Sequence, residues 1–533
     1  MPQHYITRPS DQQFLLPVDM SEWLPEDDLS KIILDLVDHK FDLSQFYGKY
    51  REDGLGAAFF DPKIMVGLIL YSYCQGVRSS RQIERFCYRD VAYRIVARNH
   101  QPDHTTISRF CKSFCSELET LFFQFLKILH ENGMVNVSVI ALDGTKMKAN
   151  AAMRRNRIIT QTEIEIKQMF EDSRIIEENE DKIYGHKEKG DIVPETLKTH
   201  KRRQELFEAA KKKMNEESAR ENQDSNERMR QREEEENDNS DGKKLRGRKP
   251  KPPVPDSQRN TKINTTDPDS RIMKSYHNDF FQGYNAQVVV SENQYIIATD
   301  VMNDENDSNL LIPMVKQLEE QDCYPVSDSI LLTDAGYWGY SNYLAVCDGP
   351  LDLLCATRKE RKMSKIDQSS RFLLDLKDIC RNPGTLFPNR TILASVAAEF
   401  YHTIISNGDF PTPPAISRWI MEARFTSKTA KKHYAKRKII VEPLFGWTKE
   451  NRNFKKFQRR GLGICKSEWK LICLTQNILK FARDMRVKSL SLVDKAVGSV
   501  IELLGVFLHF LVLLSEQRRV NMKNVSHSHR GAC

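Results

Sequence analysis

Apolar positions recur with helical spacing through the first quarter of the chain. Residues 20–134 repeat them every three to four residues with few breakers, which predicts a mostly helical region. The stretch 79–82 (Ser-Ser-Arg-Gln) resembles a capping box, and a second helix carrying Arg109 follows the turn at 102–106. Two helices around a tight turn are compatible with a helix-turn-helix reader of DNA, and an ordinary helical hairpin fits the pattern at least as well.

Two apolar runs further along the chain end on an aspartate beside a turn. The alternating run 135–143 predicts a strand that ends on Asp143 before a turn at Gly144. The run 329–333 predicts a short buried strand that ends on Asp334 at a glycine turn. The rest of the pattern predicts a hairpin of strands at 283–290 and 295–301, helices at 308–321 and 340–347, a strand at 351–357, and helices from 419 onward with interruptions near Pro443 and Gly461.

A long polar insertion interrupts these strands and helices at residues 151–275. Positions 208–240 hold almost no large apolar side chain, so we expect a solvated helix or disorder there. A basic, proline-rich stretch follows at 246–253, and its Arg246 and Arg248 loosely resemble an AT-hook, whose arginines lie in the minor groove. A plain charged linker is the other interpretation of this stretch.

The composition indicates a globular protein of several domains. The chain has 533 residues, 40% hydrophobic and 29% charged, which predicts roughly two to four domains and argues against a fibrous or membrane protein. Its 11 cysteines show no Cys-x-x-Cys spacing, which argues against a disulfide scaffold or a zinc ribbon. The longest apolar run, 503–514, is too short to span a bilayer, and the first residues lack a signal-peptide pattern. We therefore expect a protein of the reducing cytoplasm.

The positive charge of the chain is concentrated in one segment. Residues 424–488 contain 19 Lys and Arg and four acids, a net charge of +15, although the whole chain carries only +8 and the remainder therefore −7. Such a segment is typical of a surface that lies along phosphates. A solvated helix face is the alternative, but such faces usually interleave acids with bases, as residues 200–237 do.

The two strand-end aspartates come together if their strands are neighbours in one sheet. Neighbouring strands lie about 5 Å apart, a separation at which two carboxylates can share divalent cations such as Mg²⁺. Glu442 is the strongest candidate for a third acid, because it is one of the few acids in the basic segment. Each acid also has a structural interpretation, since aspartates that end strands commonly form turns or caps, and Asp300 and Asp304 occupy comparable positions.

Several stretches around these acids follow a known set of motifs. Asp143-Gly-Thr-Lys and Thr-Asp334-Ala-Gly-Tyr look like the first two acidic motifs of the DDE transposases of bacterial insertion sequences. Residues 434–449 look like the third, the Tyr-Arg-Glu-Lys signature, with one residue more between Tyr434 and Glu442 than its shortest version. The stretches 267–274 and 283–287 and the region around 60–62 also resemble that family, so the resemblance covers roughly residues 20–485.

The resemblance implies an α/β fold with an RNase H-like core, a mixed five-stranded sheet with helices on both faces. It implies the following division of the chain: an N-terminal arm at 1–19, a helical DNA-binding domain at 20–134, the core at 135–150 and 276–488, the charged insertion with its basic linker at 151–275, and a tail of unassigned role at 489–533.

The same resemblance implies DNA strand cleavage and strand transfer at the ends of an insertion sequence. Asp143, Asp334 and Glu442 would bind two Mg²⁺ or Mn²⁺ ions, which activate the attacking water or 3′-hydroxyl and stabilise the leaving oxygen. The implied partners are double-stranded DNA, at terminal inverted repeats and at the target, and a second copy of the chain, in the cytoplasm at the nucleoid and not at a membrane. DNA contacts are predicted at Tyr434, Arg437, Lys438, Lys449, Arg452, Lys455, Lys456, Arg459 and Arg460, and also at Arg109, Arg246 and Arg248.

Three alternative functions remain open on the sequence. The chain is compatible with a catalytically inactive or domesticated DNA-binding relic, although all three acids are present. A general nuclease of the same fold would use the same acids. A glycosidase also uses paired carboxylates, but the basic segment argues against it.

Overall fold

The computed structural model describes residues 19–50, 59–157, 262–275, 278–320, 329–347, 351–357 and 428–486, with isolated positions between these ranges. Most of the predicted arm, most of the insertion with Arg246 and Arg248, and the predicted tail lie outside the described residues. No helix among the residues that were placed is long and apolar enough to cross a bilayer.

The N-terminal region is helical, as predicted. Its elements are η1 (Met20–Trp23), α1 (Leu29–Asp35), η2 (Leu36–Lys40), α2 (Ser44–Tyr47), α3 (Pro62–Cys74), α4 (Ser80–Arg89), α5 (Val91–Val96), α6 (His104–Ser113) and α7 (Cys115–Glu131). The two helices predicted around a tight turn are α4 and α6, but α5 lies between them. The simple helix-turn-helix interpretation is therefore wrong, although α4 and α6 pack against each other.

Aspartates, rather than serine, cap these short helices. The side chain of Asp90 accepts a hydrogen bond from the Tyr93 amide at 3.1 Å, and that of Asp103 accepts one from the Thr106 amide at 2.7 Å. Ser79 stands at the N-cap of α4 without a side-chain hydrogen bond to the helix. The predicted capping box is therefore wrong, while the predicted start of the helix is correct.

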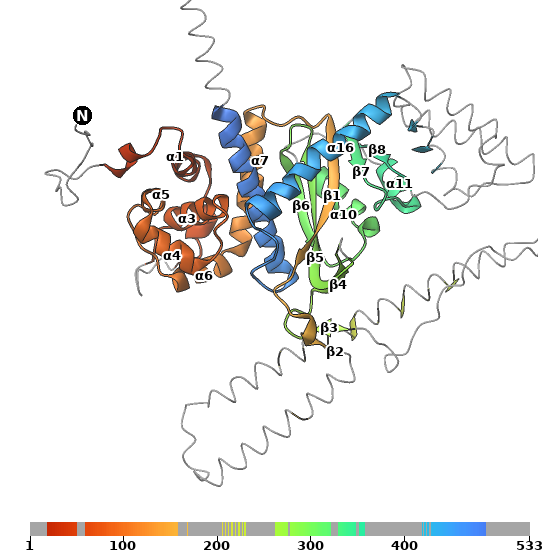
Figure 1. Ribbon diagram of the computed structural model, residues 1–533, viewed down its shortest axis with the longest axis horizontal. Helices are drawn as coiled ribbons and strands as arrows, with labels where there is room; N and C mark the ends of the chain where they lie inside the picture. Colours follow the sequence, from red (N-terminus) through yellow and green to blue (C-terminus); the bar gives the residue numbers. More distant parts are fainter. Residues whose placement is uncertain are drawn as a thin grey trace, which may run out of the picture.

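A mixed sheet forms the centre of the molecule (Figure 1). Its strands are β1 (Val139–Lys148), β4 (Arg271–Lys274), β5 (Phe280–Ser291), β6 (Ile296–Met302), β7 (Ile330–Thr333) and β8 (Asp352–Cys355). β1, β7 and β8 run parallel, whereas β5 is antiparallel to β1 and to β4 and β6. A separate two-stranded sheet pairs β2 (Asn156–Arg157) with β3 (Ile263–Asn264). After the insertion, the sheet resumes at Arg271 in β4, five residues before the predicted start of the second part of the core at residue 276.

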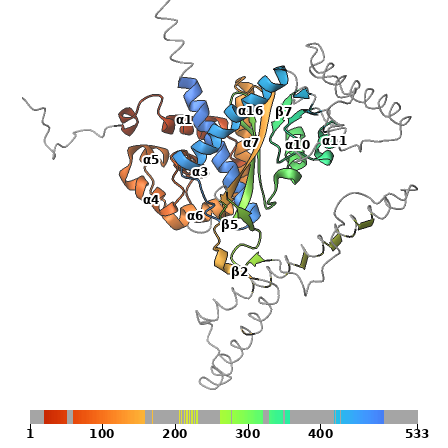
Figure 2. The same ribbon diagram turned by 45° about the vertical axis from the view of Figure 1, so that its right-hand side comes forward.

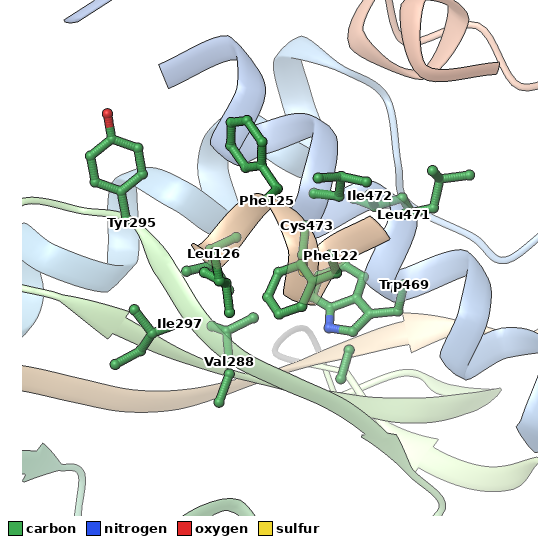
Figure 3. Close-up of a cluster of buried hydrophobic side chains, with 14 of the residues drawn as sticks. Phe122, Phe125, Leu126, Val288, Tyr295, Ile297, Trp469, Leu471, Ile472 and Cys473 are labelled. Carbon is green, nitrogen blue, oxygen red and sulfur yellow. The ribbon is translucent and has the colours of Figure 1, made fainter. Parts of the chain in front are cut away.

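Helices cover both faces of this sheet. Figures 1 and 2 show α7, α16 (Lys428–Gly446) and a helix at 462–486 on one side, with α10 (Leu311–Glu319) and α11 (Tyr340–Cys347) on the other. On the first side Phe122 and Phe125 of α7 pack with Trp469 over Val288 and Ile297 (Figure 3), and all five side chains are fully buried. Apolar burial of this extent is the main stabilising contribution to the layered arrangement.

The predicted strand at 135–143 differs from β1 in where it ends. β1 continues five residues past Asp143, because β5 pairs with it without a break from Ser291 to Gly283. Gly144 is not a turn residue: a Cβ there would stand 2.1 Å from Nε2 of Gln287, whose side chain lies across it. The glycine therefore permits a close approach within the strand, and Asp143 lies in the interior of β1.

The other predicted elements are confirmed, with one correction in α16. The β5–β6 hairpin, α10, α11, β8 and the strand before Asp334 lie where the pattern predicted them. Pro443 does not interrupt the helix, which continues to Gly446 and then forms a π-helical turn, η7 (Trp447–Asn451). Proline provides no amide for the carbonyl of Ile439, and Nε2 of Gln294 donates to that oxygen instead at 2.9 Å.

Candidate active site

The two predicted aspartates lie at the same level on adjacent strands. In the parallel ladder of β1 and β7, Ala141 is opposite Leu332, so two residues further on Asp143 is level with Asp334. Parallel neighbours are about 5 Å apart, which brings both carboxylates to one place on the sheet. This is the arrangement that the sequence predicted, although Asp143 reaches it from the interior of its strand.

Asp143 is held between a guanidinium and a backbone amide. Its Oδ2 accepts a hydrogen bond from Nη1 of Arg437 at 2.9 Å, and its Oδ1 accepts one from the Gly144 amide at 2.9 Å. Burial raises the pKa of Asp143 to about 6, because the removal of water outweighs the lowering effects of Arg437 and of the Gly144 amide. The negative charges of Asp334 and Asp307 add to this increase in the pKa.

Asp307, which the motifs did not indicate, lies beside Asp334. Oδ1 of Asp334 accepts a hydrogen bond from the Gly336 amide at 2.8 Å. A Cβ at Gly336 would stand 2.9 Å from that oxygen and 3.3 Å from Oδ2 of Asp307, so the two carboxylates flank one point. Asp307 begins the short 3-10 helix η5 (Asp307–Asn309), just before α10. The structure therefore adds a third acid next to the predicted pair.

A buried network of amides holds Asp307 in place. Its Oδ1 accepts hydrogen bonds from Nδ2 of Asn285 at 2.7 Å and from Nε2 of Gln287 at 3.3 Å. Gln287 also donates to Oδ1 of Asn285 at 2.8 Å and accepts a hydrogen bond from the hydroxyl of Tyr337. Asn285 and Gln287 occupy alternate positions of a buried strand, so their polar side chains need hydrogen-bond partners inside the protein. Polar residues at alternate positions of an otherwise apolar strand are therefore the sequence signal that could have indicated this network.

Glu442 is not part of this group in the structure. It is exposed on α16, five residues after Arg437, so on a regular helix it points about 140° around the axis from that side chain. Among the described residues, no three His, Cys, Asp or Glu side chains gather as a metal site. The structure thus brings Asp143 and Asp334 together with Asp307, and the role predicted for Glu442 stays a prediction.

Four of the nine predicted DNA contacts within residues 424–488 lie on the surface. Lys438, Lys455, Lys456 and Arg460 are exposed, as is Arg109 on α6. Tyr434 and Arg437 are partly buried, and Tyr434 packs edge-on against Phe425 with ring centroids 4.9 Å apart.

Arg452 corrects the prediction most clearly. It is buried, and its guanidinium donates to the carbonyls of Tyr73 at 2.9 Å and Ile472 at 3.2 Å and to the side chains of Thr475 and Gln476. Burial lowers its pKa to about 10, so it remains a cation at neutral pH. Arg452 therefore joins α3 to the helix 462–486 instead of contacting DNA.

Two further predicted cations also have internal partners. Nζ of Lys449 donates to the carbonyl of Lys146 at 3.1 Å, and burial lowers the pKa of Lys449. Nη1 of Arg459 donates to the carbonyl of Cys111 at 2.8 Å, which ties the basic segment to α6. Both side chains are partly buried, so their predicted contacts with DNA compete with these internal bonds.

Other side chains near the basic segment have structural roles. Phe454 and Phe457 are fully buried in the core, whereas Trp447 is 46% exposed. Asp300 is paired with Lys466 at 2.9 Å. In the stretch 267–274, Asp267 accepts a hydrogen bond from the hydroxyl of Tyr284 at 2.7 Å and from the Gly461 amide at 3.1 Å, at the start of the helix 462–486.

Comparisons with known proteins identify two parts of the chain. The family described as "Transposase domain (DUF772)" matches residues 18–113, which hold η1 to α6. The family described as "Transposase DDE domain" matches residues 415–482, which include α16 and most of the helix 462–486. No curated protein and no solved structure matches. The two matches confirm the resemblance to DDE transposases of insertion-sequence type and indicate that the chain is a transposase.

Proposed function

We propose that this transposase cleaves DNA strands and transfers them at the ends of an insertion sequence, with an RNase H-like core as its catalytic domain. The level placement of Asp143 and Asp334 on adjacent parallel strands is the observation that carries the proposal. The strand order β6-β5-β1-β7-β8 with β5 alone reversed, and the helices on both faces, support the fold assignment. Transposases act on DNA, and the exposed cations at Lys438, Lys455, Lys456 and Arg460 suit phosphate contacts.

The donor atoms at this site suit divalent cations. Carboxylate oxygens are the ligands that Mg²⁺ and Mn²⁺ prefer, and the oxygens of Asp334 and Asp307 flank one point beside Asp143. Asp143 and Asp334, with Glu442 as the third acid, would hold two such ions, which lower the pKa of an attacking water and stabilise the leaving oxygen. Because Arg437 pairs with Asp143, that ion pair must open for both carboxylate oxygens to act as ligands.

The chain's own residues prepare the site in two ways. The amide network of Asn285 and Gln287 restrains Asp307, and the Gly336 amide restrains Asp334, so these carboxylates are oriented before substrate arrives. Arg437, released from Asp143, is a cation directly beside the reacting phosphate. The DNA substrate would comprise the terminal inverted repeats and the target, bound by two copies of the chain at the nucleoid.

Cleavage of element-end DNA in the presence of Mg²⁺ tests the proposal. Asp143→Asn and Asp334→Asn are expected to lower the cleavage rate by more than about a hundredfold, because even outer partners of a metal site contribute 10- to 100-fold. DNA affinity and the unfolding temperature, measured on the same proteins, serve as controls. Wild-type cleavage rates in both variants would disprove the site.

Asp307→Asn and Glu442→Gln separate the two candidates for the third acid. Asn at 307 keeps an oxygen for the amides of Asn285 and Gln287 and removes only the charge. We expect Glu442→Gln to abolish cleavage, and Asp307→Asn to reduce it by about 10- to 100-fold and to raise the Mg²⁺ concentration at half-maximal rate. The reverse ranking would assign the third ligand to Asp307.

The reaction products distinguish the alternative functions. Strand-transfer products joined to target DNA support a transposase, whereas cleavage without joining identifies a nuclease of the same fold. DNA binding without either product identifies a relic. Inverted repeats in the DNA that flanks the gene would provide the natural substrate for this assay.

A further inference from the structure

Helix α4 presents a row of arginines to solvent. Its exposed side chains are Arg81, Gln82, Arg85, Tyr88 and Arg89, and its buried side chains are Ile83 and Cys87. Arg81, Arg85 and Arg89 are spaced four residues apart, so they lie on one face of the helix, opposite Ile83. Tyr88 on the same side is 55% exposed. We call this surface, made by Arg81, Arg85, Tyr88 and Arg89, the α4 face.

The nearby acids are engaged in contacts within the domain. Residues 78–112 contain eight Lys and Arg and only three acids. Glu84 pairs with His104 at 2.9 Å, and Asp90 and Asp103 cap α5 and α6. Eight cations against three acids leave this stretch a net charge of 8 − 3 = +5, so the α4 face has a positive potential.

Acids outnumber cations on the opposite side of the same domain. Residues 19–44 contain eight acids and two lysines, and two of these acids, Asp27 and Asp38, pair with arginines from outside this stretch. Figures 1 and 2 both show α1 and α4 on opposite sides of the N-terminal helices. Such a polarised domain attracts a polyanion to one side and repels it from the other, which orients the domain on DNA.

Contacts between the two transposase domains extend this basic surface. Nη1 of Arg78, two residues before α4, donates to the carbonyl of Lys456 at 2.6 Å. Its guanidinium also stacks on Phe454, 4.6 Å from the ring centroid. A second contact joins the same segment to α6, where Arg459 donates a hydrogen bond to the carbonyl of Cys111. The exposed Lys455 and Lys456 therefore lie beside the start of α4.

We propose that the α4 face binds the phosphate backbone of duplex DNA, on one surface with Lys455 and Lys456. The N-terminal helices and the catalytic core then hold the same duplex. This inference rests on the proposed function only in that the substrate is duplex DNA. It places the principal contact of the N-terminal domain on α4 and leaves Arg109 of α6 a secondary one.

Fluorescence anisotropy of the full chain with a labelled duplex of about 30 base pairs, over a range of salt concentrations, tests the inference. The variant is Arg81→Gln/Arg85→Gln/Arg89→Gln. The matched control is Lys40→Gln/Lys127→Gln/Lys316→Gln, which removes the same net charge from three other exposed positions. We expect Kd to rise on the order of 10- to 100-fold for the α4 variant, with the salt slope reduced by about 3, and less than about twofold for the control.

Unfolding temperatures of both triple variants should equal that of the wild type, because every substituted side chain is exposed. The binding assay contains no divalent cation and leaves Asp143 and Asp334 unchanged, so a failure of the cleavage assignment does not affect this measurement. An α4 variant with wild-type affinity and salt slope would overturn the inference. So would an equal loss of affinity in the control, since it would show that only net charge matters.

Discussion

The basic segment 424–488 and the helix α4 use their cations in opposite ways. The segment contains 19 Lys and Arg, but many of them have partners within the protein: Lys436 pairs with Glu292, Lys466 with Asp300 and Lys470 with Glu119, while Arg452 is buried. Helix α4 has three arginines, spaced four residues apart, and all three are exposed. Charge density along the sequence therefore does not measure charge at the surface.

The position of each element explains the difference. α16 and the helix 462–486 cover a face of the sheet, and the helix 462–486 also contacts α7, so many of their side chains meet protein. A long cation in such a place reaches a carbonyl or a carboxylate, because a buried charge without a partner is costly. α4 buries Ile83 and Cys87 on one side, and among the described residues its three arginines on the other side are exposed.

The largest effect on stability is expected for the buried cation Arg452. Arg452→Met removes the donors to the carbonyls of Tyr73 and Ile472 and should lower the free energy of unfolding by about 3 to 5 kcal/mol. Urea denaturation measures the change, with Arg452→Lys as a control that retains the charge. A loss below about 1 kcal/mol would show that the buried cation is not a structural tie.

An intermediate effect on stability is expected for Arg437. This cation is partly buried, and its partner within the protein is a predicted catalytic acid. Arg437 lowers the pKa of Asp143, so Arg437→Gln should raise that pKa further above about 6 in the metal-free protein. A carbon NMR titration of the carboxyl group measures this directly. Loss of the ion pair should also lower the free energy of unfolding by about 1 to 2 kcal/mol at pH 7.

The sign of the pH dependence follows from the direction of the shift. The folded protein holds the Asp143 proton more tightly than the unfolded chain, whose pKa is near 3.8. The contribution of this group to stability is therefore fully present below about pH 4 and is lost as the pH rises through about 6. The difference in stability between wild type and Arg437→Gln should shrink between pH 7 and pH 5. A constant difference would contradict the assignment of the ion pair.

The smallest effect on stability is expected for the exposed cation Lys455. Lys455 pairs with Glu450, but the two side chains are 53% and 68% exposed. Lys455→Gln should change the free energy of unfolding by less than about 0.5 kcal/mol and reduce the salt slope of DNA binding by about 1. A stability loss as large as that of Arg452→Met would remove the distinction between the two regions.

Local patterns predicted most elements of the core correctly. The hairpin of β5 and β6, the helices α10 and α11, and the strand before Asp334 each carry their periodicity within a few residues. The pattern failed where a distant residue decides the outcome. The pattern predicted a turn at Gly144, but this glycine lies within a strand because the side chain of Gln287 lies across it. The pattern predicted a break at Pro443, but the helix continues because Gln294 donates a hydrogen bond to the carbonyl of Ile439.

The candidate site divides in the same way. Asp143 and Asp334 were predictable because a small residue and a buried apolar run mark each of them in the sequence. Asp307 was not, since it lies in a polar stretch with other acids and only the amides of Asn285 and Gln287 distinguish it. Glu442 was predicted from charge contrast, and its direction on α16 depends on which side of the helix the sheet covers.

The sequence by itself determined the transposase motifs, the order of the acids, the helical and strand periodicities and the concentration of positive charge. These features depend on residue type and spacing, which need no partner. Only the tertiary structure decided that Asp143 lies inside its strand, that Asp307 stands beside Asp334, and which arginines face water. Each of these depends on an element far away in the chain, because burial and hydrogen bonding are properties of contacts between elements and not of a segment alone.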